Sequence, residues 1–212
     1  MECLLKKIKV DIKLLDEKAE LPTYAHTQLI GGEQVPMDGA MDIKATSLRY
    51  DRSMDCYIYG TGLSFNVRAG RKLHAFPRSS NRKTDCYIPN HVPLLDPMYS
   101  NELFICYKNR TSIEMRLKMM YLERKIEILE SLAGLSGEAG AQCKPIAFQN
   151  LRETSEWYYD AIEKGDEELE FAPYNVGDKI AQIFIEDYTW VQWNVVEKLT
   201  EYDRDGFGSS GK

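Results

Sequence analysis

Short runs of alternating apolar and polar residues dominate the first half of the chain, and each predicts a β-strand. The run at 4–15 predicts an edge strand. Later runs rich in β-branched and aromatic residues predict strands at 56–67, 72–76, 85–90 and 102–109. Residues 19–43 hold several Gly and Pro residues and are interpreted as a loop. Many short strands at close spacing indicate a β-sandwich or barrel.

A helical periodicity follows. Within 112–135 the apolar residues are spaced four, three, four, three, so they form one stripe on a helix: Met115, Met119, Leu122, Ile126 and Leu129. We interpret the stripe as packing surface rather than as a cofactor site. A Gly/Ala/Ser-rich linker at 134–142 and a second helical stretch at 150–165 complete a helical hairpin. Inside a β-rich chain, this hairpin predicts an insertion at about 111–170.

Strand character returns at 178–199. Alternation places Trp190 and Trp193 on opposite faces of this strand, so at least one of them is expected to reach the core or a partner subunit. Residues 203–212 have few apolar side chains and predict a flexible tail. The length fits one large domain, and we expect a single domain over 1–212 that carries the insertion and the tail.

Composition narrows the classes of partner. A net charge of −6 leaves no broad basic face, which argues against nucleic acid but leaves room for a small anion held by a few local cations. The five cysteines form no CxxC pair and no Cys/His ligand spacing, and we interpret them as reduced thiols. We find no signal peptide and no apolar run of membrane-spanning length, so we expect a soluble, cytoplasmic protein that binds no membrane.

Polar clusters lie on the predicted turns between strands, where functional groups are common. Arg78, Ser79 and Ser80 combine a guanidinium with hydroxyl and backbone N–H groups, a set that suits phosphate oxygens and also fits a solvated turn. Asp96 lies between apolar residues and Pro97, so it is either a general base or the start of an Asx turn.

Two further polar residues stand in predicted strands. Gln182 lies among apolar neighbours and must pair its amide with backbone or with a ligand. Asp42 starts a strand and, taken alone, is an ordinary surface carboxylate. Neither residue defines an activity by itself.

Taken in order, these clusters resemble the five motifs of the trimeric dUTP pyrophosphatase (dUTPase) family. The matching segments are "GAMDIKA" with Asp42, "RSS" at 78–80, "PLLDPMYSNE" with Asp96 and Tyr99, "GDKIAQI" with Gln182, and "DGFGSSG" near the C-terminus. Five matches in order are far more specific than any one of them. The resemblance covers the chain except for the helical insertion, which stands where the family has a short connection between its third and fourth motifs.

The resemblance implies an all-β fold, a distorted jelly-roll barrel that assembles as a homotrimer with shared active sites. Motifs one, two and four come from one subunit, the third motif from a second and the fifth from a third. The family cleaves dUTP to dUMP and pyrophosphate with Mg²⁺, so we expect a dUTP diphosphatase.

The resemblance also assigns roles to single residues. Asp96 would activate the water that attacks the α-phosphorus in line, and Asp42 would hydrogen-bond waters of the Mg²⁺ shell. Tyr99 would pack under the deoxyribose, and Phe207 would stack on the uracil. The remaining substrate contacts would come from Asn90 on the uracil edge and, on the phosphates, from Arg78, Ser79, Ser80, Gln182, Arg204, Ser209 and Ser210.

Some positions depart from the family motifs. Pro93 stands where the third motif has Gly and supplies no N–H, and Ser100 and Asn101 replace the usual Arg-Gly. In the fifth motif, Tyr202 holds the usual place of the arginine, and Arg204 is the candidate substitute.

Two alternatives stay open. A dCTP deaminase shares the fold and the Arg-Ser-Ser turn but needs a glutamate base beside the pyrimidine, whereas this chain has Asp96, Tyr99 and the Phe-Gly-Ser tail. A non-catalytic nucleotide-binding or regulatory protein would use the helical insertion to contact a partner. Retention of Asp96 argues against that class, and burial of the apolar stripe against the chain's own barrel would remove its main support.

Overall fold

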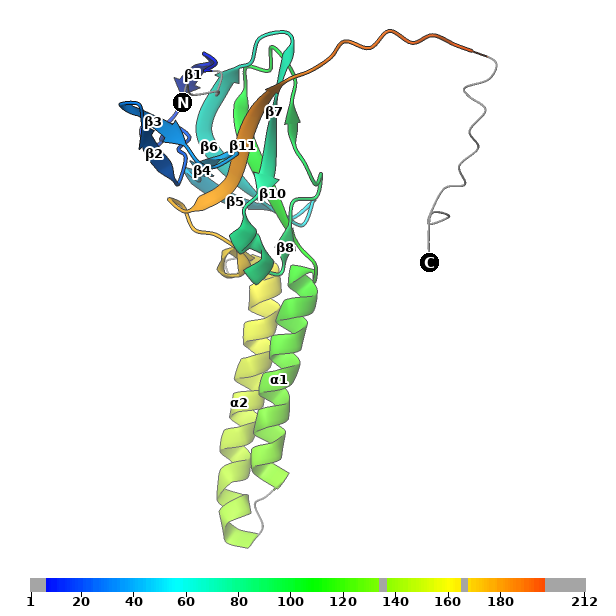
Figure 1. The fold of residues 1–212 in the computed structure, drawn as a ribbon. Coiled ribbons are helices and arrows are strands. Elements are labelled where there is room, and N and C mark those ends of the chain that lie inside the picture. The colour runs from blue at the N-terminus through cyan, green and yellow to red at the C-terminus, as the bar shows by residue number, and fades with distance from the viewer. Residues whose placement is uncertain (1–6, 134–136, 165–167, 197–212) are drawn as a thin grey trace, which may run out of the picture.

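A computed structural model describes residues 7–133, 137–164 and 168–196. Antiparallel sheets form a barrel-like body, and a helical hairpin projects from one end of it (Figure 1). The predicted all-β fold with an inserted helical hairpin is confirmed. The fifth motif, with Arg204, Phe207, Ser209 and Ser210, lies outside the described residues.

Two antiparallel sheets make up most of the barrel. The five-stranded sheet has the order β1 (Asp11–Leu14), β6 (Cys56–Asn66), β10 (Glu102–Asn109), β8 (Cys86–Tyr87), and β5 (Ser47–Asp51) also pairs with β6. The four-stranded sheet has the order β4 (Met41–Lys44), β11 (Lys179–Asp187), β7 (Arg71–Pro77), β9 (Leu94–Leu95).

The core consists of the inward-facing residues of both sheets. Alternation along β7 and β11 turns Leu73, Ala75 and Ile183 inward, and all three are fully buried. From the other sheet, Leu63 and Ile105 join the same cluster. Because each residue removes most of its apolar surface from water, this cluster stabilises the packing of the two sheets. The described cysteines, Cys56, Cys86, Cys106 and Cys143, are free thiols.

Residues 19–43 are not a loop, so that prediction was wrong. They contain β2 (Thr27–Ile30) and β3 (Glu33–Pro36), which pair as a hairpin, and the start of β4. The two residues between β2 and β3, Gly31 and Gly32, have φ values of 61° and 85°. Only glycine adopts such angles without strain, and a Gly-Gly turn between two short strands is a recognised hairpin signal.

The hairpin that projects from the barrel consists of α1 (Ile113–Ala133) and α2 (Gly137–Lys164). The predicted linker at 134–142 was too long, because α2 begins at Gly137 rather than near residue 150. Pro145 lies inside α2, but it is exposed, so the carbonyl it leaves without an N–H partner can bind water. No helix within the described ranges has the length and apolar character needed to cross a membrane.

The strand predicted at 178–199 ends at Asp187, so its second half was predicted wrongly. Asp187 pairs with Arg71, the first residue of β7, and among the described residues no strand pairs with the chain beyond Asp187. Residues 188–196 leave the barrel as an extended arm (Figure 1). Trp190 and Trp193 are 93% and 86% exposed on this arm, so neither reaches the core of its own chain.

Candidate active site

Strand register brings three of the predicted motifs to one end of the four-stranded sheet. Asp42 on β4 is paired with Gln182 on β11, and Gln182 is paired with Phe76 on β7. Arg78 follows β7 directly, after Pro77. Antiparallel pairing therefore places side chains from the first, second and fourth motifs close together.

These side chains meet around the carboxylate of Asp42. Arg78 Nε donates to Asp42 Oδ1 at 2.9 Å, and Gln182 Nε2 donates to the same oxygen at 3.2 Å. Lys179 Nζ lies 2.9 Å from Asp42 Oδ2. The Asp42 side chain is only 2% exposed. We refer to Asp42, Arg78, Lys179 and Gln182 as the Asp42 cluster.

The electrostatics of the Asp42 cluster favour an anionic ligand. Burial raises the pKa of the Asp42 carboxyl, but hydrogen bonds from Lys179 and Arg78 lower it and prevail, so the pKa lies below the ordinary value of 3.8. The carboxylate is therefore ionised at neutral pH. Two cations face one anion, and the excess positive charge suits a phosphate group.

The turn after β7 presents further donors. Ser79 begins the short helix η1 (Ser79–Lys83) and is exposed, whereas Ser80 is half-buried. Arg78 Nη1 donates to Ser80 Oγ at 3.4 Å and to the Lys179 carbonyl at 3.3 Å. These contacts fix the guanidinium beside the Ser80 hydroxyl, so Arg78, Ser80 and Gln182 of the predicted phosphate-binding set are brought together around Asp42.

Two residues of this region were missed in the sequence. Lys179 stands inside the "GDKIAQI" segment, so its place in a motif could have identified it. Tyr174 follows the short helix η2 (Glu168–Phe171) and carries no sequence signal. Its hydroxyl bonds Asn81 Oδ1 at 3.3 Å, and its carbonyl accepts from Tyr59 Oη at 2.8 Å. Tyr174 thus fastens η1 to the core.

Asp96 lies far from the Asp42 cluster within one chain. It follows β9, and β9 pairs with Leu73 and His74 near the start of β7, whereas Arg78 follows the end of β7. At about 3.3 Å per residue, the two sites are on the order of 15–20 Å apart. Asp96 is exposed, and its carbonyl accepts from Tyr99 N at 3.2 Å in a tight turn.

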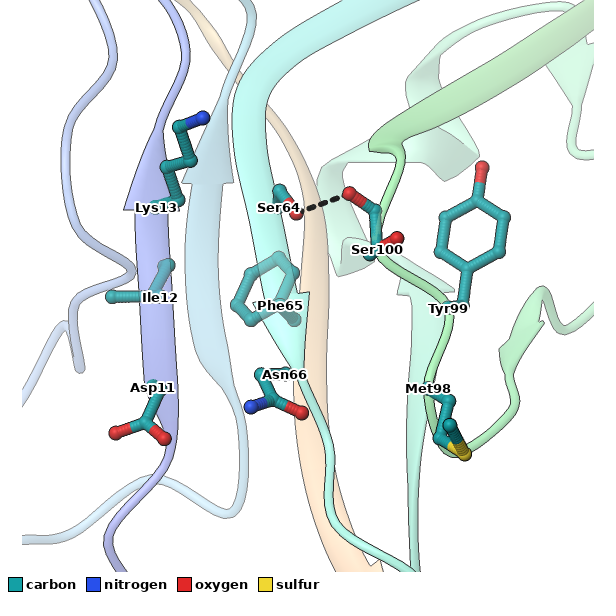
Figure 2. Close-up of a pocket in the computed structure, with 9 residues that line it drawn as sticks. All are labelled: Asp11, Ile12, Lys13, Ser64, Phe65, Asn66, Met98, Tyr99 and Ser100. Atoms are coloured by element: carbon teal, nitrogen blue, oxygen red, sulfur yellow. Dashed lines mark hydrogen bonds between the residues drawn. The ribbon is translucent and has the colours of Figure 1, made fainter.

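Tyr99 lines a pocket of about 180 Å³ between β1, β6 and the turn at 98–100 (Figure 2). Tyr99 is 40% exposed, and its hydroxyl donates to the Glu102 carbonyl at 3.1 Å. Ser64 Oγ donates to the Ser100 carbonyl at 2.7 Å, which ties the turn to β6. Ser100 therefore contributes backbone to the turn, where the family pattern has an arginine side chain.

Asn90 lines a different pocket of about 400 Å³, together with Pro93, Phe104 and Cys106. The Asn90 side chain is exposed. Pro93 accepts a hydrogen bond from Ala75 N at 2.9 Å through its carbonyl, so the hairpin is held at this point without the missing N–H. The structure therefore explains how Pro93 is accommodated, but it does not bring Asn90 and Tyr99 into one pocket.

The described residues do not form a resident metal site. In the part of the chain that the structure describes, no group of three or more His, Cys, Asp and Glu side chains could hold a metal ion. Both oxygens of Asp42 already face cationic or amide donors. Mg²⁺ takes few protein ligands when phosphate oxygens and water are available, so this set fits a cation that arrives with a triphosphate.

Comparisons with known proteins identify the fold that this chain shares. No protein-family model and no curated protein matches the chain. A dUTPase mutant of Staphylococcus bacteriophage 80alpha, solved with dUpNHpp, superposes with a TM-score of 0.54 at 16% identity, covering 97% of this chain and 99% of that one. The dUTPase from phage phi11 of S. aureus, with its species-specific insert, gives 0.51 at 16% identity and covers 92% and 100%.

A mutant of the phi11 enzyme, described for its coordination of a structural Mg(II) ion, gives a TM-score of 0.50 at 16% identity and covers 90% of this chain and 98% of that one. These similarities extend over nearly the whole length of each chain. They confirm the resemblance found in the motifs at the level of structure. The chain has the fold of the phage dUTPases.

Proposed function

We propose that the protein hydrolyses dUTP to dUMP and pyrophosphate. The observation that carries this proposal is the Asp42 cluster, in which residues of three dUTPase-like motifs converge on a buried, ionised carboxylate with an excess of positive charge. The similar 80alpha enzyme was solved with dUpNHpp, which makes a deoxyuridine triphosphate the first substrate to test.

In this proposal the reaction depends on positioning and charge neutralisation. Arg78, Ser79, Ser80 and Gln182 hold the phosphate oxygens. Asp96 accepts a proton from a water that attacks the α-phosphorus in line. The bond between the α-phosphorus and its bridging oxygen breaks, and pyrophosphate leaves. Such transfers need little covalent participation by the protein.

The base and sugar would be read by the third motif. Tyr99 would pack under the deoxyribose, where it leaves no room for a 2′-hydroxyl, and Asn90 would read the uracil edge. Since these residues line different pockets in one chain, the turn at 96–100 must rearrange or meet another copy when substrate binds.

Mg²⁺ enters this proposal with the substrate, as a magnesium–triphosphate complex. When bound, it would neutralise charge on the triphosphate, and Asp42 would accept a hydrogen bond from one of its waters. Lys179 now lies beside Asp42 Oδ2 and would turn to a phosphate oxygen when that water binds. The ionised state of Asp42 supports this role.

We further propose a homotrimer with shared active sites. The separation of Asp96 from the Asp42 cluster supports this arrangement, because the general base of one copy could then serve the phosphate site of another. A cyclic assembly repeats the same contact at every interface. The segment 203–212, with Arg204, Phe207, Ser209 and Ser210, would close over the nucleotide from a third copy.

The proposal is tested by pyrophosphate release from dUTP, dCTP, dTTP and UTP, with and without Mg²⁺. We expect Mg²⁺-dependent turnover of dUTP only, and a loss of about 10²-fold or more for Asp96→Asn, because a positioned general base contributes that much. No dUTP turnover, or turnover unchanged in the variant, would refute the mechanism. Ammonia release from dCTP would indicate the deaminase instead.

Removal of residues 203–212 is a second test. If these residues close over the substrate, the truncated chain keeps its fold and assembly but loses most of its dUTP turnover. Circular dichroism and sedimentation check the fold and assembly, and the pyrophosphate assay checks turnover. Full activity of the truncated chain would remove the tail from the proposal.

A further inference from the structure

α1 packs against α2 through one side only. Ile113 and Leu117 are buried at 4% and 2% exposure. The ring of Tyr121 stacks on Tyr158 with 4.7 Å between centroids, and further along α1 the guanidinium of Arg124 lies 4.2 Å from the ring centroid of Trp157. The burial of Ile113 and Leu117 and the ring contacts with α2 define the face of α1 that the rest of this chain covers.

The predicted apolar stripe is a different face. Its residues are 44–53% exposed: Met115, Met119, Leu122, Ile126 and Leu129. A helix turns by about 100° per residue, which places the stripe on roughly the opposite side of α1 from Leu117 and Tyr121. The stripe is therefore not buried against the chain's own barrel, and the interpretation of it as packing surface requires a partner outside this chain. An apolar row of this length that faces water indicates an interaction site.

The spacing of the stripe identifies the kind of partner. Intervals of four, three, four, three correspond to heptad positions d, a, d, a, d, with Met119 and Ile126 at a. A helix that covers a globular core has a wider apolar face, whereas a seam restricted to a and d is typical of a coiled coil. The stripe thus fits another helix.

Charges beside the seam select the orientation of that helix. Position g holds Lys118 and Lys125, and position e holds Glu123 and Glu130, while Arg116, also at e, is already paired with Asp85. In a parallel pair of identical helices, each g residue faces the e residue five positions later on the other helix, so every such contact joins Lys to Glu. An antiparallel pair would bring Lys to Lys and Glu to Glu.

The charged residues are available for these contacts. Lys118, Glu123 and Glu130 are exposed and form no ion pair within the described ranges. Lys125 is half-buried and bonds only the Tyr121 hydroxyl there, at 3.3 Å between Nζ and Oη. A neighbouring carboxylate would offer this ammonium a stronger partner than a phenol.

We propose that α1 forms a parallel coiled coil with α1 of a second copy of this chain. Self-complementary charge makes identical chains the best match for this surface. Rotation about an axis that runs along the helical hairpin generates parallel copies of α1. A cyclic assembly of any small order is therefore compatible with this pairing. The pairing involves only α1 and does not depend on dUTP hydrolysis.

Cysteine cross-linking of the full-length protein tests the register directly. Parallel, in-register helices bring identical d positions to within disulfide distance, so Met115→Cys and Leu129→Cys should each form covalent dimers alone under mild oxidation. Glu127→Cys, which is also exposed on α1 but outside the seam, is the matched control. The wild-type chain reports the background from native cysteines.

Covalent dimers that form only when Met115→Cys and Leu129→Cys are mixed would reveal antiparallel helices and overturn the proposal. Cross-linking no greater than that of Glu127→Cys would also overturn it, and would indicate that a different protein covers the stripe. A charge swap gives an independent check. Lys118→Glu with Lys125→Glu should suppress cross-linking of Leu129→Cys, and adding Glu123→Lys with Glu130→Lys should restore it. Failure of this restoration would contradict the e–g pairing.

Discussion

The role of Asp42 depends on its environment in the fold, which the sequence alone does not reveal. In the sequence it is an ordinary carboxylate at the start of a strand. In the structure it is almost fully buried between Arg78 and Lys179, with Gln182 bonded to the same oxygen as Arg78. A buried carboxylate of this kind holds two cations in place, and those cations are the groups that can bind phosphate.

Replacement of Asp42 by Asn should therefore lower both stability and activity. The variant keeps the shape of the side chain but leaves two neighbouring cations without their anion, so we expect a loss of about 1–3 kcal/mol in the free energy of unfolding. Urea denaturation measures this change, with the exposed Asp160→Asn as control. Equal stability of the Asp42 variant and wild type would show that the cluster does not support the fold.

The same ion pairs predict a pH dependence. Because the folded-state pKa of Asp42 is below its ordinary value of 3.8, its contribution to stability is present above that value and is lost as the pH falls through the folded-state pKa. The stability difference between wild type and Asp42→Asn should thus be full near neutral pH and shrink below about pH 4. Urea titrations at several pH values measure it. A difference that grows on acidification would contradict the assignment.

At the scale of elements, β6 depends on a glycine. Gly62 has a φ of 65°, and a Cβ there would lie 2.8 Å from Ala19 Cβ and 3.0 Å from Asp16 Cβ. Gly62→Ala should destabilise the protein by about 2 kcal/mol or more, through backbone strain and overpacking. Gly70 also has a positive φ, of 90°, but a Cβ there would have no atom within 4 Å. Gly70→Ala therefore measures the cost of backbone strain without overpacking.

Thermal unfolding of Gly62→Ala and Gly70→Ala separates the cost of backbone strain from the cost of overpacking. The Gly70 variant should lose only the cost of the left-handed backbone, so its midpoint should fall less than that of the Gly62 variant. Equal midpoints would show that crowding at Gly62 is relieved by small shifts of β6.

Local patterns predicted the elements with strong periodicity and missed those that depend on tertiary contacts. Period-two runs identified β6, β7, β10 and β11, and helical spacing identified α1. The hairpin of β2 and β3 was missed although Gly31 and Gly32 mark its turn, because Gly and Pro were interpreted as loop signals. The end of β11 was missed since alternation continues past Asp187, where β7 no longer supplies a partner.

The candidate site was predictable where residues belong to motifs. Asp42, Arg78, Ser80 and Gln182 were identified from their segments, and strand register brings them together. Tyr174 was not predictable, because it supports the site through contacts 93 and 115 residues away in sequence, with Asn81 and Tyr59. No local pattern encodes such contacts.

At the scale of the whole molecule, the residues proposed for the active site are separated within the described part of one chain. The Asp42 cluster and Asp96 lie at opposite ends of β7. The helical hairpin of α1 and α2 and the exposed arm at 188–196 both project beyond the barrel (Figure 1). Assembly of several copies, with active sites formed between them, would explain the separation of Asp96 from the Asp42 cluster, the projecting hairpin and the exposed arm.

Subunit complementation tests this central claim most directly. Asp96→Asn and Arg78→Ala each inactivate the enzyme alone in our account. If Asp96 of one copy serves the Arg78 site of another, co-refolding equal amounts of the two variants should restore about a quarter of the wild-type dUTP turnover, since random assembly completes that share of sites in a symmetric oligomer. Pyrophosphate release no higher than that of the separate variants would contradict the account, because it would place Asp96 and Arg78 in the same chain's site or outside catalysis altogether.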